Sequence, residues 1–301
     1  MAMQFDWRRA LLYGIAVPIG GALLWSRFCW EPLPEFGQLL SQINANLRLA
    51  NSIPATDSDG KPVPAREQML AAAERDITIA LRCDQASAVL AEFEGFAESL
   101  RGDYVDAAAH YRRAQSMPDC SDEQRAVLAF NEARMLRRSG KLQDAMSVLE
   151  AAQPRMTAGY AEQCMLERAE IAASMSRNEN AENAKSRSHA FELLTAVLRS
   201  DRPVAWLQAG DVYASLGANA EADAAWARAS SAVPIADGRR ARLKLAEGDA
   251  DTALQLFERA AIAAPAEMRR LVREDPAAWQ AIAEDARYRQ LVDSSAAAPV
   301  R

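Results

Sequence analysis

The stretch from Pro203 to Pro234 constrains the fold of this chain more than any other. Apolar residues recur at helical spacing in its first half, and Pro203 suits the first turn of a helix, where no backbone N–H is needed. Gly217 stands where that helix must end, and a second apolar face follows. A small residue at Gly210 would let two helices approach closely around Trp226. The stretch therefore predicts two antiparallel helices joined by a tight turn.

Related patterns of large and small residues lie on both sides of this stretch. They occupy 88–119 and 126–154, a weaker copy spans 157–201, and a shortened copy ends at Pro265. The pattern resembles the tetratricopeptide repeat (TPR), a helix–turn–helix unit of 34 residues. The central stretch carries the resemblance at Trp206, Gly210, Tyr213, Gly217, Ala222, Trp226, Ala229 and Pro234. The resemblance implies an all-α fold, a TPR-like helix–turn–helix solenoid.

The remaining segments fit this scheme as an atypical start and a closing cap. Helices are predicted over 32–50 and 65–83, joined by a polar loop, which together form a degenerate first repeat. At the other end, 275–292 resembles the closing segment of bacterial repeat proteins, with Trp279, Ile282, Tyr288 and Leu291 covering the last repeat. The predicted domains are an N-terminal membrane signal anchor (1–30), a TPR-like repeat domain (31–265), and C-terminal capping helices with a tail (266–301).

The N-terminal segment has the features of a membrane anchor. Residues 10–25 carry no charge, and a helix from Trp7 to Trp30 would span about 36 Å, enough for a bilayer core of roughly 30 Å. Arg8 and Arg9 precede the run, so the positive-inside rule places the N-terminus in the cytoplasm and the repeats outside. A cleaved signal peptide is the alternative, although no A-x-A site follows the run.

The sequence offers little that points to catalysis. Only two histidines occur in its 301 residues, and the chain lacks the common metal, nucleotide and nucleophile motifs. We therefore expect no enzyme activity, no metal and no cofactor. The net charge of −6 argues against nucleic-acid binding, which needs a positive footprint. Whether Cys83, Cys120 or Cys164 form disulfides stays open at this stage.

In the TPR family the first helix of each pair lines a concave groove in which a partner peptide lies. Arg134 and Arg138 are four residues apart and share one helical face, while Arg112 and Arg113 fall on the opposite, convex side. Arginine forks bind carboxylates and their stems pack on aromatic rings, so the expected ligand is a short acidic segment with an apolar side chain. Phenylalanines are expected to be partly exposed beside them, although a role in the core is equally open. The residues carried over by the resemblance as partner-binding are Phe93, Phe96, Phe130, Asn131, Arg134, Arg138, Gln208, Asp211 and Arg242.

The function that this organisation predicts is a non-enzymatic, membrane-anchored scaffold for protein–protein interaction. The composition, rich in alanine and arginine, suggests a bacterium with a GC-rich genome, so the expected location is the inner membrane with the repeat domain in the periplasm. The alternative is a structural accessory subunit of a larger bacterial membrane complex, held through its anchor and its convex surface. The sequence identifies neither the partner nor the oligomeric state.

Overall fold

A computed structural model describes residues 36–56, 60–83, 87–177 and 181–293. The described residues form helices, with a single isolated β-bridge between Thr56 and Pro62. The chain divides into two compact units, Met1–Gln85 and Ala86–Arg301, and each is treated by itself. The predicted anchor over 1–30 lies outside the described residues. Within those residues, no helix combines the length and apolar character needed to cross a membrane.

The first unit contains one helical hairpin, α3 (Phe36–Ser52) and α4 (Pro64–Leu81). Its helices agree with those predicted from the sequence, and the polar segment between them forms the connection. Pro64 occupies the start of α4, where its missing N–H leaves no hydrogen bond unmade. Both helices bury one residue per turn, which gives the hairpin its apolar seam; these residues are Leu39, Ile43, Leu47, Ala50, Leu70, Ala73, Ile77 and Ala80.

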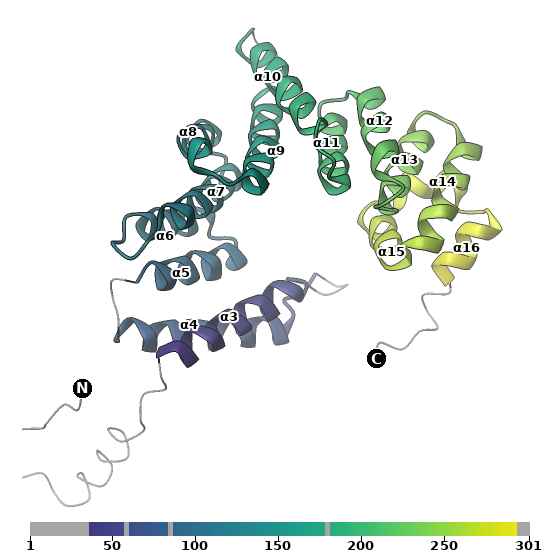
Figure 1. The fold of residues 1–301 in the computed structure, drawn as a ribbon. Helices are drawn as coiled ribbons and strands as arrows, with labels where there is room; N and C mark the ends of the chain where they lie inside the picture. Colours follow the sequence, from purple (N-terminus) through teal and green to yellow (C-terminus); the bar gives the residue numbers. More distant parts are fainter. Residues whose placement is uncertain (1–35, 57–59, 84–86, 178–180, 294–301) are drawn as a thin grey trace, which may run out of the picture. The chain divides into compact units, whose positions relative to one another are not determined.

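The second unit is a succession of five helical hairpins followed by a terminal cap (Figure 1). Each second helix also contacts the first helix of the next hairpin. The hairpins are α5 (Ala88–Arg101) with α6 (Tyr104–Gln115), α7 (Asp122–Arg138) with α8 (Leu142–Ala152), α9 (Ala158–Met175) with α10 (Ala181–Val197), α11 (Pro203–Ser215) with α12 (Asn219–Ala229), and α13 (Ile235–Ala246) with α14 (Ala250–Ala263). A short 3₁₀ turn, Gln153–Arg155, follows α8. The cap consists of α15 (Pro265–Glu274), the 3₁₀ segment η2 (Pro276–Ile282) and α16 (Ala286–Asp293).

Glycines make the sharp turns inside these hairpins. Gly217 ends α11 with φ of +69°, a left-handed conformation that a side chain disfavours. Gly102, Gly140 and Gly248 hold the equivalent turns with φ of +93°, +82° and +85°. The α9–α10 hairpin has a longer connection instead, as the polar sequence over 176–183 predicts.

The central hairpin, α11–α12, is closed by the contact between Gly210 and Trp226. A Cβ atom added to Gly210 would come within 2.5 Å of Trp226 Cδ1, so only glycine permits this approach. Trp226 and Tyr213 are buried at 3% exposure each, as expected for seam residues. Trp206, the first residue of the repeat pattern in this stretch, is only half-buried: Arg228 lies 4.0 Å from its ring centroid, and the indole N–H of Trp206 donates to the carbonyl of Ser200.

A separate core closes the C-terminal end of the unit. The helices α13 and α14 share this core with α15, η2 and α16. Trp279 and Ile282 are buried in it, and the ring of Phe257 lies 5.4 Å from the rings of both Trp279 and Tyr288. The predicted covering role of Trp279, Ile282 and Tyr288 is thus seen in the structure, while the side chain of Leu291 lies outside the described residues. Apolar surface that an open repeat stack would expose is covered here.

Candidate protein-interaction surface

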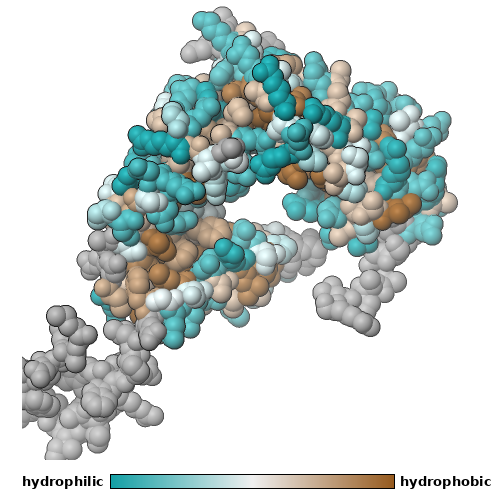
Figure 2. Space-filling model, viewed as in Figure 1, coloured by the Kyte–Doolittle hydropathy of each residue, from teal (hydrophilic) through white to brown (hydrophobic). Residues whose placement is uncertain are grey.

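Charged side chains on first helices pair with one another at two places in the second unit, between α7 and α9 and between α11 and α13. We call this surface the first-helix face. On the face visible in Figure 2, hydrophilic side chains are spread over α9 to α16, with hydrophobic residues visible between them. The first-helix face is defined by Glu92 on α5, Arg134, Arg137 and Arg138 on α7, Glu167 and Glu170 on α9, Asp211 on α11, and Arg239 and Arg242 on α13.

Arg137 joins α7 to α9 by two ion pairs. Its Nε donates to Glu167 Oε1 at 2.6 Å, and its Nη2 lies 2.7 Å from Glu170 Oε2. Glu167 is buried, and a buried carboxylate is stable only when it is paired. Arg134 approaches the same group less closely, with its Nε 3.9 Å from Glu167 Oε2. Glu167 is therefore held mainly by Arg137, and Arg134 is its more distant partner.

Asp211 on α11 contacts both α12, the second helix of its own hairpin, and α13, the first helix of the next hairpin. Its Oδ1 accepts from Trp226 Nε1 at 3.2 Å, and its Oδ2 lies 3.4 Å from Arg239 Nη2 on α13. Burial raises the pKa of Asp211, against the opposing effects of Arg239, the Trp226 N–H and Arg242. Burial likewise raises the pKa of Glu170 on α9, against the lowering effects of Arg137 and Arg134 and with smaller raising effects from Glu167 and Asp211.

The two arginines predicted to bind a partner stack on aromatic rings. The guanidinium of Arg134 lies 5.7 Å from the ring centroid of Phe130, and that of Arg138 lies 5.5 Å from the ring of Tyr104 on α6. This stacking matches the packing expected from the sequence. The positive charges of both arginines lower the pKa of Tyr111, but burial outweighs them and raises it to about 12. Arg134 and Arg138 therefore line one region, next to α6.

The aromatic residues of the predicted groove are less uniform than expected. Phe93 and Phe96 on α5 are half-buried, which agrees with the prediction of partial exposure. Phe130 is buried at 9% exposure in the core of the unit, so the expectation that it is partly exposed is wrong. It faces the packed interior because α7 contacts both α6 and α8. Beside Phe93, burial raises the pKa of Glu92.

The other predicted partner-binding residues occupy different parts of the first-helix side. Asn131 follows Phe130 on α7 and is half-buried, whereas Gln208 on α11 is exposed one turn before Asp211. Arg242 on α13 is half-buried and lowers the pKa of Asp211 by its charge. The structure thus brings Arg242 near Asp211, as it brings Arg134 near the carboxylates of α9.

Sequence reasoning missed the acidic members of this surface on α9. Glu167 and Glu170 belong to the weak repeat, whose register could not be carried over from the family pattern. Their spacing of three residues matches that of Arg134 and Arg137 on the preceding first helix. Pairs of opposite charge at the same spacing on consecutive first helices are the signal in the sequence that could have located these acidic residues.

Arg112 and Arg113, predicted to lie on the convex side, both form ion pairs within the chain. The Nη2 of Arg112 lies 2.6 Å from Oε1 of Glu132, a carboxylate buried at 2% exposure. Gln115 donates to the second oxygen of Glu132 at 2.7 Å, and Arg113 pairs with Glu94. Replacing Arg112 would leave Glu132 buried with one partner fewer, so this pair is unsuitable as a neutral control for binding experiments.

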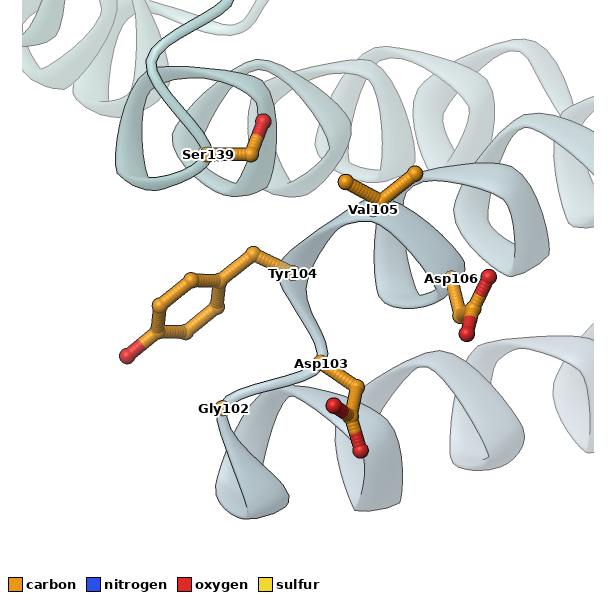
Figure 3. A pocket seen from close by; sticks show the side chains of 6 residues that line it. All are labelled: Gly102, Asp103, Tyr104, Val105, Asp106 and Ser139. Carbon is orange, nitrogen blue, oxygen red and sulfur yellow. The ribbon is translucent and has the colours of Figure 1, made fainter.

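A pocket of about 340 Å³ lies at the turn between α5 and α6. It is lined by Gly102, Asp103, Tyr104, Val105, Asp106 and Ser139 (Figure 3). The ring of Tyr104 and the carboxylate of Asp106 point to opposite sides of the start of α6 (Figure 3). A catalytic site needs groups that converge on one point, and these side chains do not converge.

Histidine, cysteine and carboxylate side chains are the remaining groups that could bind a metal or act as nucleophiles. Among the residues that the structure describes, no three His, Cys, Asp or Glu side chains are grouped as a metal site requires. Cys83, Cys120 and Cys164 are free thiols, of which the last two are buried. Burial raises the pKa of Cys164 to about 11, which lowers its reactivity.

Comparison with known proteins yields similarities of fold. No protein-family model and no curated protein matches the sequence. PilF of Pseudomonas aeruginosa is 15% identical with a TM-score of 0.47, over 78% of this chain and 98% of that chain. The C-terminal part of a TPR repeat-containing protein from Cytophaga hutchinsonii is 14% identical with a TM-score of 0.48, over 85% and 92%. Yeast Tom70 is 17% identical with a TM-score of 0.49, over 85% of this chain and 50% of that chain.

At these identities the likeness assigns no ligand or partner to this chain. The architecture is established by the chain's own hairpins, in which glycine turns, small residues and the Trp226 seam occupy the positions that the repeat pattern predicts. The described part of the chain has a TPR-like helical-repeat fold.

Proposed function

We propose that this chain is a non-enzymatic, membrane-anchored scaffold that binds a segment of a partner protein across its first-helix face. One observation carries the proposal: charged side chains of consecutive first helices pair with one another, α7 with α9 and α11 with α13, and several of them keep exposed surface. A long row of polar groups suits an extended polypeptide better than a small molecule, which needs an enclosed pocket.

We propose that the arginines of α7 bind acidic side chains of the partner segment. Arg134 and Arg138 are held over the rings of Phe130 and Tyr104, which restricts their rotamers and lowers the entropy lost on binding. The side chain of Arg134 is 38% exposed, and its Nε lies 3.9 Å from Glu167 Oε2, too far for a close ion pair. A carboxylate from a partner can therefore reach both guanidinium groups, which supports an acidic segment as the ligand.

We infer the location from the sequence of the first 30 residues. The uncharged run, the preceding Arg8 and Arg9, and the flanking tryptophans favour a single-pass anchor in a bacterial inner membrane with the repeats in the periplasm. Fractionation of a tagged protein should recover it with the inner membrane, and a reporter fused after Arg301 should be periplasmic. Recovery in the soluble fraction, with an N-terminus beyond residue 20, would instead demonstrate a cleaved signal peptide.

Site-specific photocrosslinking tests the binding face. A photoreactive residue is placed at Gln208, exposed on α11, and in a matched variant at Gln143, exposed on the second helix α8. We expect crosslinks to a partner from Gln208 and few from Gln143. Crosslinks from Gln143 alone would favour the alternative, an accessory subunit held through its convex surface.

Charge reversal then tests the arginines. Arg134→Glu with Arg138→Glu should abolish the Gln208 crosslink while leaving the circular dichroism spectrum unchanged. Arg269→Glu with Arg273→Glu is the matched control, because these arginines share the same four-residue spacing on α15 and lie outside the first-helix face. Equal loss in both double variants would show that the attraction is diffuse, and would contradict a defined site.

A further inference from the structure

Glu92 on α5 differs from the other carboxylates that are buried or half-buried on the first-helix side of the second unit. On α7, α9, α11 and α13, each such carboxylate is paired with an arginine of this chain; they are Glu132, Glu162, Glu167, Glu170, Asp211 and Asp237. Glu92 is half-buried as well. Within the part of the second unit that the structure describes, no arginine, lysine or histidine forms an ion pair with it.

The environment of Glu92 is unfavourable for an unpaired charge. Burial raises the pKa of Glu92, and no hydrogen bond or cation among the described residues opposes that rise. A carboxylate that is removed from water is costly unless a partner compensates it. The residue nevertheless keeps part of its surface exposed, so a group from outside the chain can reach it.

The position of Glu92 around α5 places it on the first-helix face. Gly95 packs against α6, since a Cβ atom added to it would lie 3.2 Å from the ring of Tyr111. Glu94 lies on one flank of this contact, where it pairs with Arg113 of α6. Residues two apart on an α-helix point about 200° from each other. Glu92 therefore lies on the other flank, away from Arg113.

Two phenylalanines give this flank an apolar surface. Phe96 lies four residues after Glu92 and therefore on the same side of α5, and Phe93 is the next residue along the chain. Both phenylalanines are half-buried. The stems of lysine and arginine pack on apolar surface while their charged ends reach an anion, and an aromatic ring attracts a cation. A carboxylate beside phenylalanines therefore suits a basic side chain.

We propose that Glu92 binds a basic side chain of the partner segment, and that the stem of this side chain packs on Phe93 and Phe96. The inference rests on the proposed function and specifies the chemistry of the partner at α5. The next first helix, α7, presents Arg134 and Arg138 to acidic side chains of the same segment. Charge complementarity thus requires a basic and an acidic group in succession along the segment.

Peptide selection tests this chemistry without knowledge of the natural partner. A library of random peptides of about nine residues, roughly 30 Å long when extended, is selected on the detergent-solubilised full-length protein. The same library is selected on Glu92→Gln and on the matched control Glu123→Gln, which removes the same charge from an exposed position of α7. We expect the native protein and the control to enrich lysine or arginine at one position, and Glu92→Gln to lose this enrichment. Basic residues enriched equally by all three proteins, or by none, would refute the proposal.

Calorimetric titration of one selected peptide then measures the contact itself. Replacing the basic residue of the peptide with glutamine should weaken its binding to the native protein roughly tenfold. The same replacement should leave binding to Glu92→Gln unchanged, because the carboxylate that recognises the charge is gone. Equal weakening for both proteins would show that the basic residue binds elsewhere, and the inference would be wrong.

Urea unfolding distinguishes this binding role from a structural one. Glu92→Gln should leave the unfolding midpoint unchanged or raise it, because it removes a desolvated charge without breaking an ion pair. Glu132→Gln should lower the midpoint, because that carboxylate is buried and paired with Arg112. An equal fall for both variants would mean that Glu92 is paired within the chain, which contradicts the proposal.

The outcomes separate this inference from the scaffold function. Selected peptides that depend on Arg134 and Arg138 but contain no basic residue would leave the scaffold function standing and overturn this inference. A library that yields no peptide would overturn this inference too. The scaffold function itself would be contradicted only if the crosslink from Gln208 were also absent.

Discussion

Replacing Trp226 with alanine should destabilise the central hairpin more than any other single truncation on α12. The indole is 3% exposed, and its N–H donates to Leu207 O and Asp211 Oδ1, both at 3.2 Å. Truncation of a buried tryptophan costs about 3–5 kcal/mol because a cavity is left behind. Gly210 has no side chain to fill that cavity, so we expect a loss of about 4–5 kcal/mol.

Urea unfolding followed by circular dichroism measures the total loss, and hydrogen exchange shows where it acts. Repeat stability is largely nearest-neighbour, so the amides of α11, α12 and the adjoining helices should exchange faster. The amides of α3 and α4, which belong to the other unit, should change little. Trp226→Phe is the control: it keeps most of the ring and loses the hydrogen bonds, at a cost of about 1–2 kcal/mol. A loss below about 1 kcal/mol for Trp226→Ala, or exchange raised equally in every helix, would refute this reasoning.

Three further predictions concern other parts of the chain. Both carboxylate oxygens of Asp119 accept from the Ala88 N–H, at 3.1 and 3.0 Å. Asp119→Ala should therefore destabilise the start of α5 by about 0.5–2 kcal/mol, measured by urea unfolding. Unchanged stability would show that water replaces this cap. Burial raises the pKa of Tyr111 from 10.0 to about 12, so its neutral form stabilises the fold below pH 10 and that contribution is lost as the pH rises toward 12. Tyr111→Phe should make the fall in unfolding free energy over this range shallower, and an identical slope would contradict the assignment. In the native protein, iodoacetamide should modify the exposed Cys83 well before the buried Cys164, as peptide mass spectrometry would show; equal rates would mean that the hairpin around Cys164 opens readily.

Much of the fold follows from the sequence because its determinants are local. Helical spacing of apolar residues, a proline at a first turn and a glycine at a left-handed turn act over a few residues each, so the hairpin around Gly217 could be predicted without knowing its neighbours. The contact between Gly210 and Trp226 is of the same kind, because both lie within one repeat. The placement of Arg134 and Arg138 over aromatic rings was predicted for a similar reason: one ring, Phe130, lies one turn earlier on the same helix.

Which surface charges pair with one another depends on the tertiary structure. Arg137 meets Glu167, thirty residues away, through the register between two first helices, and no local pattern sets that register. The same holds for Arg112 on α6, which pairs with the buried Glu132 on α7, twenty residues away. Phe130 became a core residue because helices on both sides cover it. Local spacing determines that a helix has an apolar and a polar face; the register of neighbouring helices determines which polar groups are paired and which remain open to a partner.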